Sequence, residues 1–187
     1  GFKEFCAKVS IETSSVQYEN DSLMRKVRGC DDYGIACCVS YQAIGKAIQF
    51  FGARANLAKA LLLAINEGRC ENTGTLMVEG IKPLSSDVLD FDEVMENYKK
   101  VLHEVARVYN ETMNIIHFMH DKYDYEKSQM AFIDTDPKIN LAYGVAGLSI
   151  VADSLSAIKH AKVTARRNAD GLTEGFDIEG SFPMFGN

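Results

Sequence analysis

The stretch FDEVMENYKKVLHEVARVYNETMNIIHFMHDK, residues 91–122, carries the longest helical pattern in the chain. Apolar residues recur in it at spacings of three and four, which is typical of a helix with one buried face. Asp90 can cap the first turn, and Glu93 stands where a capping box has its acidic partner. At about 1.5 Å per residue such a helix is roughly 48 Å long, whereas a small domain spans about 30 Å. The sequence therefore predicts a helix from Phe91 to Lys122 inside a large folded body.

A second helix is predicted over Ala53–Asn66, a stretch rich in alanine and leucine. Gly68 follows at a position typical of a helix C-terminal cap. Arg54 lies at the expected N-terminus, where the helix dipole disfavours a cation. An anionic ligand would explain this arginine, although a solvated surface arginine is the more ordinary explanation.

Two adjacent cysteines, Cys37 and Cys38, lie in the otherwise apolar run Gly34–Ser40. Adjacent Cα atoms are about 3.8 Å apart, whereas disulfides prefer roughly 4.4–6.8 Å, so we expect two free thiols. On a strand their side chains would point to opposite faces, which suits a relay between two partners. Free cysteines are more often small buried residues without chemistry, and the dipeptide alone favours that ordinary role.

Shorter elements are predicted towards the N-terminus. Apolar and polar residues alternate in Ala7–Glu12, which predicts a half-buried strand that ends near Thr13. A short helical turn is expected over Ser22–Val27, and Glu71–Pro83 is expected to be a connecting loop. The glycines of Arg28–Gly34 predict a loop beside the two cysteines, and loops are where reactive groups are usually carried.

The C-terminal part has weaker patterns. The run of small apolar residues Leu141–Val151 predicts a buried strand with close neighbours. Asp153 or Ser154 would cap a following helix that runs through Lys162. The remainder is expected to be polar turns around a strand near Phe176–Ile178.

The composition indicates an ordinary globular protein. Of the 187 residues, 47 % are hydrophobic and 25 % are charged, which argues against a disordered chain. The length fits one large domain or part of a larger protein. A net charge of −6 gives no electrostatic footprint for nucleic acid, and no apolar run reaches the roughly 18 residues of a membrane helix. We therefore expect no nucleic-acid and no membrane partner.

The five cysteines are Cys6, Cys30, Cys37, Cys38 and Cys70. They form neither a paired framework nor a Cys-x-x-Cys zinc spacing, and this pattern fits a reducing compartment. His117 and His120 stand three residues apart on the predicted long helix, but no glutamate completes a His-Glu-x-x-His pattern. We therefore expect no metal site, and a cytoplasmic protein, with an organelle left open for a eukaryotic host.

Two runs, IACCVS at 35–40 and QFFGARANLAK at 49–59, resemble the active-site region of the pyruvate formate-lyase family of glycyl radical enzymes. The resemblance continues through NIIHFMHDKY at 114–123 and ADSLSAIK at 152–159, and it covers essentially the whole chain. Tyr41 stands where the family often has proline, and nothing matches the family's radical loop Arg-Val-x-Gly-Tyr. We therefore expect residues 1–187 to be an interior segment of the catalytic domain, with the C-terminal glycyl radical domain absent.

The resemblance implies an α/β fold, of which this chain would be an incomplete part of a ten-stranded α/β barrel. It implies formate C-acetyltransferase activity, which converts pyruvate and coenzyme A to acetyl-CoA and formate by a radical mechanism. Cys37 would hold the acetyl group as S-acetylcysteine, and Cys38 would be the thiyl radical relay. Arg54 would bind the substrate carboxylate through its planar pair of donors, and Phe51 would line the pocket.

The resemblance implies no cofactor bound in this segment, because the glycyl radical would come from the C-terminal region. Coenzyme A would act as a co-substrate beside pyruvate. Further implied partners are an activating enzyme that uses S-adenosylmethionine and a second copy of the full-length protein in a homodimer. The implied role is anaerobic or fermentative pyruvate metabolism, and the segment alone is expected to be inactive.

Two alternatives stay open. The first is a 2-oxobutyrate formate-lyase or another glycyl radical enzyme. The double cysteine argues against the dehydratases, which resemble this family but use one cysteine, whereas one substrate methylene is worth only about 1–3 kcal/mol of discrimination. The second is a non-catalytic thiol, redox or metal-binding module, which stoichiometric metal binding would identify.

Overall fold

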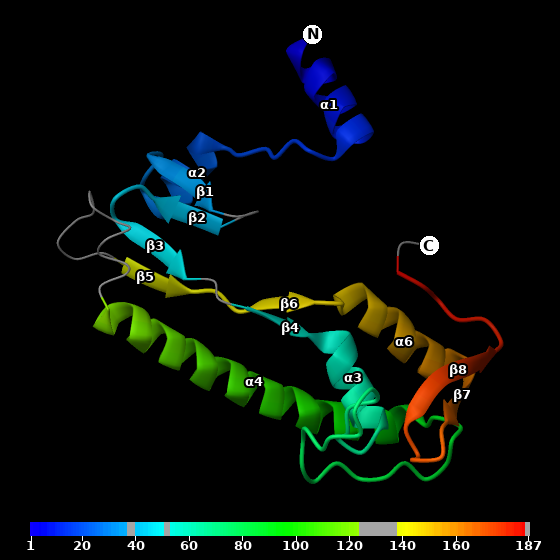
Figure 1. Cartoon of the computed structure of the whole chain (residues 1–187). Coiled ribbons are helices and arrows are strands. Elements are labelled where there is room, and N and C mark those ends of the chain that lie inside the picture. The colour runs from blue at the N-terminus through cyan, green and yellow to red at the C-terminus, as the bar shows by residue number, and fades with distance from the viewer. Residues whose placement is uncertain (37–39, 51–52, 124–137, 186–187) are drawn as a thin grey trace. The chain divides into compact units, whose positions relative to one another are not determined.

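The computed structural model describes residues 1–36, 40–50, 53–123 and 138–185 (Figure 1). Two compact units can be separated, one of Gly1–Gln49 with Met130–Asn140 and one of Phe50–Gln129 with Leu141–Asn187. Across the described ranges, no helix combines the length and the apolar character that crossing a lipid bilayer requires.

The described residues of the first unit form two helices and two small sheets. In chain order its elements are α1 (Phe2–Thr13), α2 (Asp21–Arg28), β1 (Tyr33–Ala36), β2 (Ser40–Ala43), β3 (Ala47–Phe50) and β5 (Lys138–Leu141). β1 pairs antiparallel with β2, and β3 pairs with β5. The helical turn expected over Ser22–Val27 is confirmed as α2, whose first turn is capped by the Asn20 side chain.

The strand expected over Ala7–Glu12 is wrong, because these residues belong to α1. Phe2, Phe5 and Val9 recur at helical spacing, and this longer pattern outweighs the six-residue alternation. The hydroxyl of Ser10 donates to the Cys6 carbonyl at 2.9 Å, so this polar side chain is satisfied inside the helix. None of the α1 residues is buried, so local hydrogen bonding rather than core packing defines the element.

The second unit contains the hydrophobic core. In chain order its elements are β4 (Arg54–Asn56), α3 (Leu57–Ile65), α4 (Phe91–Lys122), β6 (Gly144–Ala146), α6 (Leu148–His160), β7 (Lys162–Arg167) and β8 (Thr173–Glu179). β7 pairs antiparallel with β8, which confirms the strand expected near Phe176–Ile178. The polar turns expected after residue 163 are wrong at β7, where Val163 and Ala165 alternate with polar residues and are buried.

β4 and β6 are parallel neighbours, with Arg54 opposite Gly144 and Asn56 opposite Ala146. Figure 1 shows each strand running directly into a helix, β4 into α3 and β6 into α6. Parallel strands require a crossover connection, and here α3 and α4 lie between them along the chain. The described residues thus combine helices with small sheets, as the expected α/β class requires. The described residues form four two-stranded sheets rather than a closed barrel, so the ten-stranded barrel stays a prediction.

α3 packs against α4 through small and branched side chains. Ala60 and Ala64 of α3 and Val94 and Val101 of α4 are at most 2 % exposed. Alanines let the two helix backbones approach closely, and each buried valine adds about 1.5–3 kcal/mol of hydrophobic stabilisation. This contact holds the α3 end of β4 against the first half of α4.

α3 begins at Leu57, so the helix start expected at Ala53 is wrong by four residues. The side-chain oxygen of Asn56 accepts a hydrogen bond from the Lys59 amide at 3.1 Å and caps the first turn. The residues before this cap pair with β6 as strand β4, and the gain in ladder hydrogen bonds outweighs their local helix propensity.

The C-terminal role predicted for Gly68 is confirmed. Its amide donates to the Leu63 carbonyl at 2.7 Å, which is the long hydrogen bond of a Schellman turn. Glu67 takes a left-handed conformation with φ of 56°, and Gly68 itself has φ of 80°. A Cβ atom on Gly68 would lie 1.9 Å from the Val78 carbonyl oxygen, so only glycine fits this close approach.

The single strand expected over Leu141–Val151 is wrong, because this run contains the end of β5, all of β6 and the start of α6. Gly147 ends β6 with φ of 81°, a conformation that glycine adopts without steric cost. A Cβ atom there would lie 3.3 Å from the Cβ of Ala58 in α3. The glycines therefore break the run instead of supporting one strand.

α6 begins at Leu148, so neither Asp153 nor Ser154 caps it as expected. The Asp153 carboxylate accepts a hydrogen bond from the Phe185 amide at 2.6 Å. The Ser154 hydroxyl donates to the Ile150 carbonyl at 2.7 Å within the helix. Both residues lie beyond the first turn of α6, so neither side chain caps the helix.

α4 spans Phe91–Lys122, as predicted. The Asp90 side chain accepts hydrogen bonds from the amides of Asp92 and Glu93, both at 3.0 Å. The Glu93 carboxylate, expected to complete a capping box, is used by the amide and hydroxyl of Ser85, both at 3.0 Å. The cap is therefore confirmed, while its acidic partner ties the preceding loop to the helix.

Candidate active site

Three of the four predicted site residues, Cys37, Cys38 and Phe51, lie outside the described residues. β1 ends at Ala36 and β2 begins at Ser40, and these two residues are partners in the antiparallel register. The two described strands therefore flank, along the chain, the segment that contains both cysteines. The roles predicted for these three residues stay predictions.

Arg54 is the first residue of β4 and is exposed. The expectation that it opens a helix is wrong, because α3 begins only after the Asn56 cap. The helix dipole therefore gives no reason to expect an anion at this arginine. What the structure offers is an exposed, permanently charged guanidinium at the start of a parallel strand, with a planar fork of donors that suits a carboxylate.

The start of β4 is held by Tyr109 of α4. The Tyr109 hydroxyl donates to the carbonyl oxygen of Ala53, and the Gly144 carbonyl oxygen lies 3.3 Å from the same hydroxyl. The Tyr109 ring meets the Tyr143 ring edge-on, with centroids 5.1 Å apart and an interplanar angle of 78°. Tyr109 lies within the helix predicted over Phe91–Lys122, but the sequence carried no signal that its hydroxyl reaches two strands.

A cavity of about 270 Å³ lies beside Arg54. Its walls come from β4, α3, α4 and the loop after α3, and they include Leu63, Val78, Glu104 and Tyr109. The Glu104 carboxylate accepts from Arg107 Nε at 2.9 Å, and this hydrogen bond lowers the pKa of Glu104. Among the described residues that line the cavity, Arg54 is the one with a cationic side chain.

A thiol outside the predicted site has an unusual environment. The Cys70 sulfur accepts a hydrogen bond from Lys59 Nζ at 3.2 Å, and the same ammonium forms an ion pair with Glu71. Hydrogen bonds from the Thr73 side chain, the Asn72 backbone and Lys59 lower the pKa of Cys70 to about 7. Near neutral pH a large fraction of Cys70 is therefore the nucleophilic thiolate. In the sequence analysis Cys70 appeared only in the count of cysteines, because it is the fold that brings Lys59 of α3 to it.

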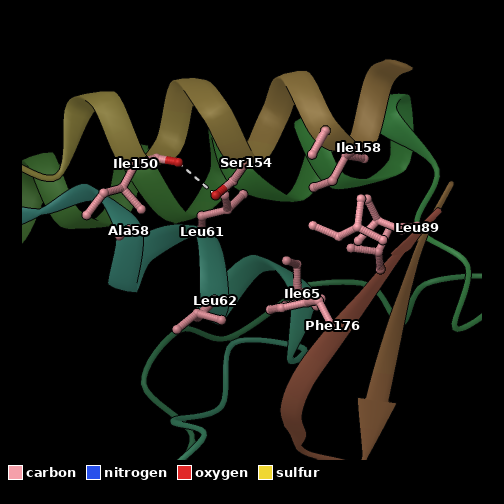
Figure 2. Close-up of a pocket in the computed structure, with 12 residues that line it drawn as sticks. Ala58, Leu61, Leu62, Ile65, Leu89, Ile150, Ser154, Ile158 and Phe176 are labelled. Carbon is pink, nitrogen blue, oxygen red and sulfur yellow. Dashed lines mark hydrogen bonds between the residues drawn. The ribbon is translucent and has the colours of Figure 1, made fainter. Parts of the chain in front are cut away.

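An apolar cavity of about 250 Å³ lies between α3, α6 and β8 (Figure 2). Its lining includes Leu61, Leu62, Ile150 and Phe176, and none of its lining residues is titratable. The Ser154 hydroxyl faces this space but is bonded within its own helix. The cavity can accept an apolar group, and its walls supply no acid, base or nucleophile.

Metal chemistry has no visible support in the described ranges. They contain no group of three or more His, Cys, Asp or Glu side chains that could hold a metal ion. His117 and His120 both lie near the C-terminal end of α4.

Comparison with known proteins identifies the family. The family model described as pyruvate formate lyase-like matches residues 1–187. Formate acetyltransferase 1 of Escherichia coli strain K12 is 55 % identical over 186 residues, which are 100 % of this chain and 24 % of that protein. The chain thus spans about a quarter of the length of this curated relative. A match of this extent shows that the chain belongs to the pyruvate formate lyase-like family.

Proposed function

We propose that this chain is the cysteine-bearing segment of a formate acetyltransferase, which converts pyruvate and coenzyme A to acetyl-CoA and formate. The observation that carries the proposal is the 55 % identity over 186 residues to a protein of that name. That protein is about four times as long, which supports a segment of a larger protein, and we place it in the interior of the catalytic domain. The parallel pair β4 and β6, each followed by a helix, is the local arrangement that a ten-stranded α/β barrel would repeat.

The two adjacent thiols would carry the reaction. As a thiyl radical, the Cys37 sulfur would add to the keto carbon of pyruvate. The bond to the carboxylate carbon would then break, leaving the acetyl group on Cys37 as a thioester and releasing a carbon dioxide radical anion. This anion would take a hydrogen atom from the Cys38 thiol and leave as formate, which returns the radical to Cys38. The thiol of coenzyme A would then take the acetyl group by thioester exchange and free Cys37. Cys38 would pass the radical to Cys37, and a glycyl radical elsewhere in the full-length protein would supply this one-electron chemistry.

Arg54 would bind the pyruvate carboxylate. Its exposed position at the start of β4 and its place on a cavity wall support this role. A bidentate pair with a carboxylate fixes direction as well as charge, so the keto carbon would be held at attack distance from Cys37. Phe51 would line the same pocket and limit access of water.

The partners follow from the same proposal. They are pyruvate, coenzyme A, an activating enzyme that uses S-adenosylmethionine, and a second copy of the full-length protein. No cofactor would be bound by this segment itself, and the protein would work in the cytoplasm in anaerobic pyruvate metabolism.

The test uses the full-length protein that contains this segment, activated without oxygen. Exchange of labelled formate into the carboxylate of pyruvate is measured for the wild type, Cys37→Ser and Cys38→Ser, with Cys6→Ser of α1 as the matched control. The wild type and Cys6→Ser should exchange formate, whereas Cys37→Ser and Cys38→Ser should lose exchange yet still acquire the glycyl radical signal in electron paramagnetic resonance.

Near-native exchange by either of those two serine variants contradicts the two-thiol mechanism. A wild-type protein that forms the radical but releases no formate from pyruvate contradicts the proposed activity. Comparing pyruvate with 2-oxobutyrate in the same assay decides which 2-oxo acid is preferred.

A further inference from the structure

The Tyr109 hydroxyl lies beside Arg54 and Gly144, the first residue pair between β4 and β6. It donates to the carbonyl oxygen of Ala53, immediately before Arg54, and it lies 3.3 Å from the carbonyl oxygen of Gly144. Gly144 is the residue opposite Arg54 in the parallel register. One hydroxyl of α4 therefore contacts both strands at the level of Arg54.

The Ala53 carbonyl and the Arg54 amide belong to the same planar peptide unit. A hydrogen bond that fixes the direction of this carbonyl therefore also fixes the plane that leads into Arg54. β4 is only three residues long and its described ladder has three register pairs, so few other bonds orient it. The Tyr109 bond adds a constraint from α4 at the first residue pair of this short ladder.

Tyr109 is itself held in place. Its ring packs edge-on against Tyr143, and the Tyr143 hydroxyl donates to the Asn110 side-chain oxygen at 2.8 Å. Tyr109 and Asn110 are neighbours on α4, so the helix is tied at two adjacent residues to the strands and to the segment before β6. The hydroxyl of Tyr109 thus links the long helix α4 to the start of β4 through a hydrogen bond.

We propose that Tyr109 is a positioning residue for Arg54, whose hydroxyl orients the peptide entering Arg54 and so aims the guanidinium at the substrate carboxylate. This inference rests on the proposed function, in which Arg54 binds that carboxylate. In this role Tyr109 acts through Arg54, although it also lines the cavity beside that arginine.

The first arm of the test measures the positioning itself. Hydrogen exchange is followed by mass spectrometry in the full-length protein for the wild type, Tyr109→Phe and the control Tyr143→Phe, which keeps the ring pair and loses a different hydrogen bond. Backbone amides of residues 54–56 and 144–146 should exchange about 3- to 10-fold faster in Tyr109→Phe, the effect expected for one lost hydrogen bond. Equal exchange in all three proteins overturns the proposal.

The second arm measures substrate binding in the activated enzyme. Tyr109→Phe should raise the KM for pyruvate about 3- to 10-fold, the size of one neutral hydrogen bond, with the KM for coenzyme A and the radical content unchanged. Because Tyr109 acts through Arg54, the double variant Tyr109→Phe/Arg54→Lys should lose no more kcat/KM than Arg54→Lys alone. Tyr143→Phe, which keeps the ring pair but loses the bond to Asn110, should raise the KM for pyruvate less than Tyr109→Phe does.

Equal increases in KM for both substrates, or fully additive losses in the double variant, overturn the positioning role and leave the proposed function intact. Wild-type protein that carries the radical but releases no formate from pyruvate overturns the proposed function. It then also overturns the proposal that Arg54 binds the pyruvate carboxylate. The two failures are therefore distinguishable in one set of proteins.

Discussion

The side-chain oxygen of Asn66 accepts a hydrogen bond from the hydroxyl of Thr173 at 2.7 Å, which joins the end of α3 to the first residue of β8. The same oxygen accepts from the Thr173 amide at 3.1 Å and from Arg167 Nη1 at 3.3 Å. Asn66 is 2 % exposed and Thr173 is 6 % exposed, so water cannot readily replace these bonds. One buried amide oxygen satisfies three donors that are distant from it in the chain.

Replacing Asn66 with alanine should lower the free energy of unfolding by about 2–3 kcal/mol, because it leaves buried donors without an acceptor. Thr173→Val removes only the hydroxyl donor and should cost about 1 kcal/mol. Denaturant titration followed by circular dichroism measures both values in the full-length protein. Equal losses for the two variants would show that the amide oxygen is not the shared acceptor.

Gly68→Ala should destabilise the protein more than Gly80→Ala, although both glycines have positive φ, of 80° and 74°. Alanine in the left-handed region costs about 1–2 kcal/mol at either position. At Gly68 the new Cβ would also meet the Val78 carbonyl oxygen at 1.9 Å, whereas at Gly80 nothing lies within 4 Å. Displacing that backbone should add about 1–3 kcal/mol. Melting temperatures of the two variants provide the comparison, and a larger drop for Gly80→Ala would contradict the geometry.

The Cys70 thiol should react with iodoacetamide at a rate that rises with pH through a midpoint near 7, because its pKa is lowered to about 7. Below that pH the thiol is protonated and slow, and above it the thiolate dominates. Lys59→Met removes one stabilising hydrogen-bond donor and should move the midpoint upward. Peptide mapping of the alkylated protein identifies the site, with Cys70→Ser as the blank. A midpoint unchanged in Lys59→Met would show that the lysine does not stabilise the thiolate.

Arg54→Lys in the full-length enzyme should lower kcat/KM for pyruvate on the order of 10²-fold, since lysine keeps the charge but loses the planar pair of donors that fixes the substrate. The melting temperature should stay near the wild-type value, because Arg54 is exposed. Arg166→Lys on β7, whose arginine is exposed and paired with Asp177, serves as the matched control and should keep full activity. Full activity in Arg54→Lys together with a large loss of melting temperature would make Arg54 a structural residue.

Local patterns predicted the elements whose stabilising contacts are themselves local. The sequence predicted both ends of α4. The helical period relates residues three or four positions apart, and the Asp90 cap bonds amides two and three residues on, so both signals can be seen within one turn of the chain. α1 was missed because a short alternation in Ala7–Glu12 also fits a strand, and only the spacing from Phe2 onward separates the two.

By itself, the sequence determined the family, through the runs at 35–40 and 49–59, and the long helix at its centre. Only the tertiary structure decided that Arg54 begins a strand, that Tyr109 reaches the carbonyl before it, and that Lys59 meets the Cys70 thiol. The physical reason is that each of these depends on hydrogen bonds between segments far apart in the chain. Such bonds outweigh local helix propensity, which differs by less than about 1 kcal/mol per residue among ordinary residues, and no local pattern records them.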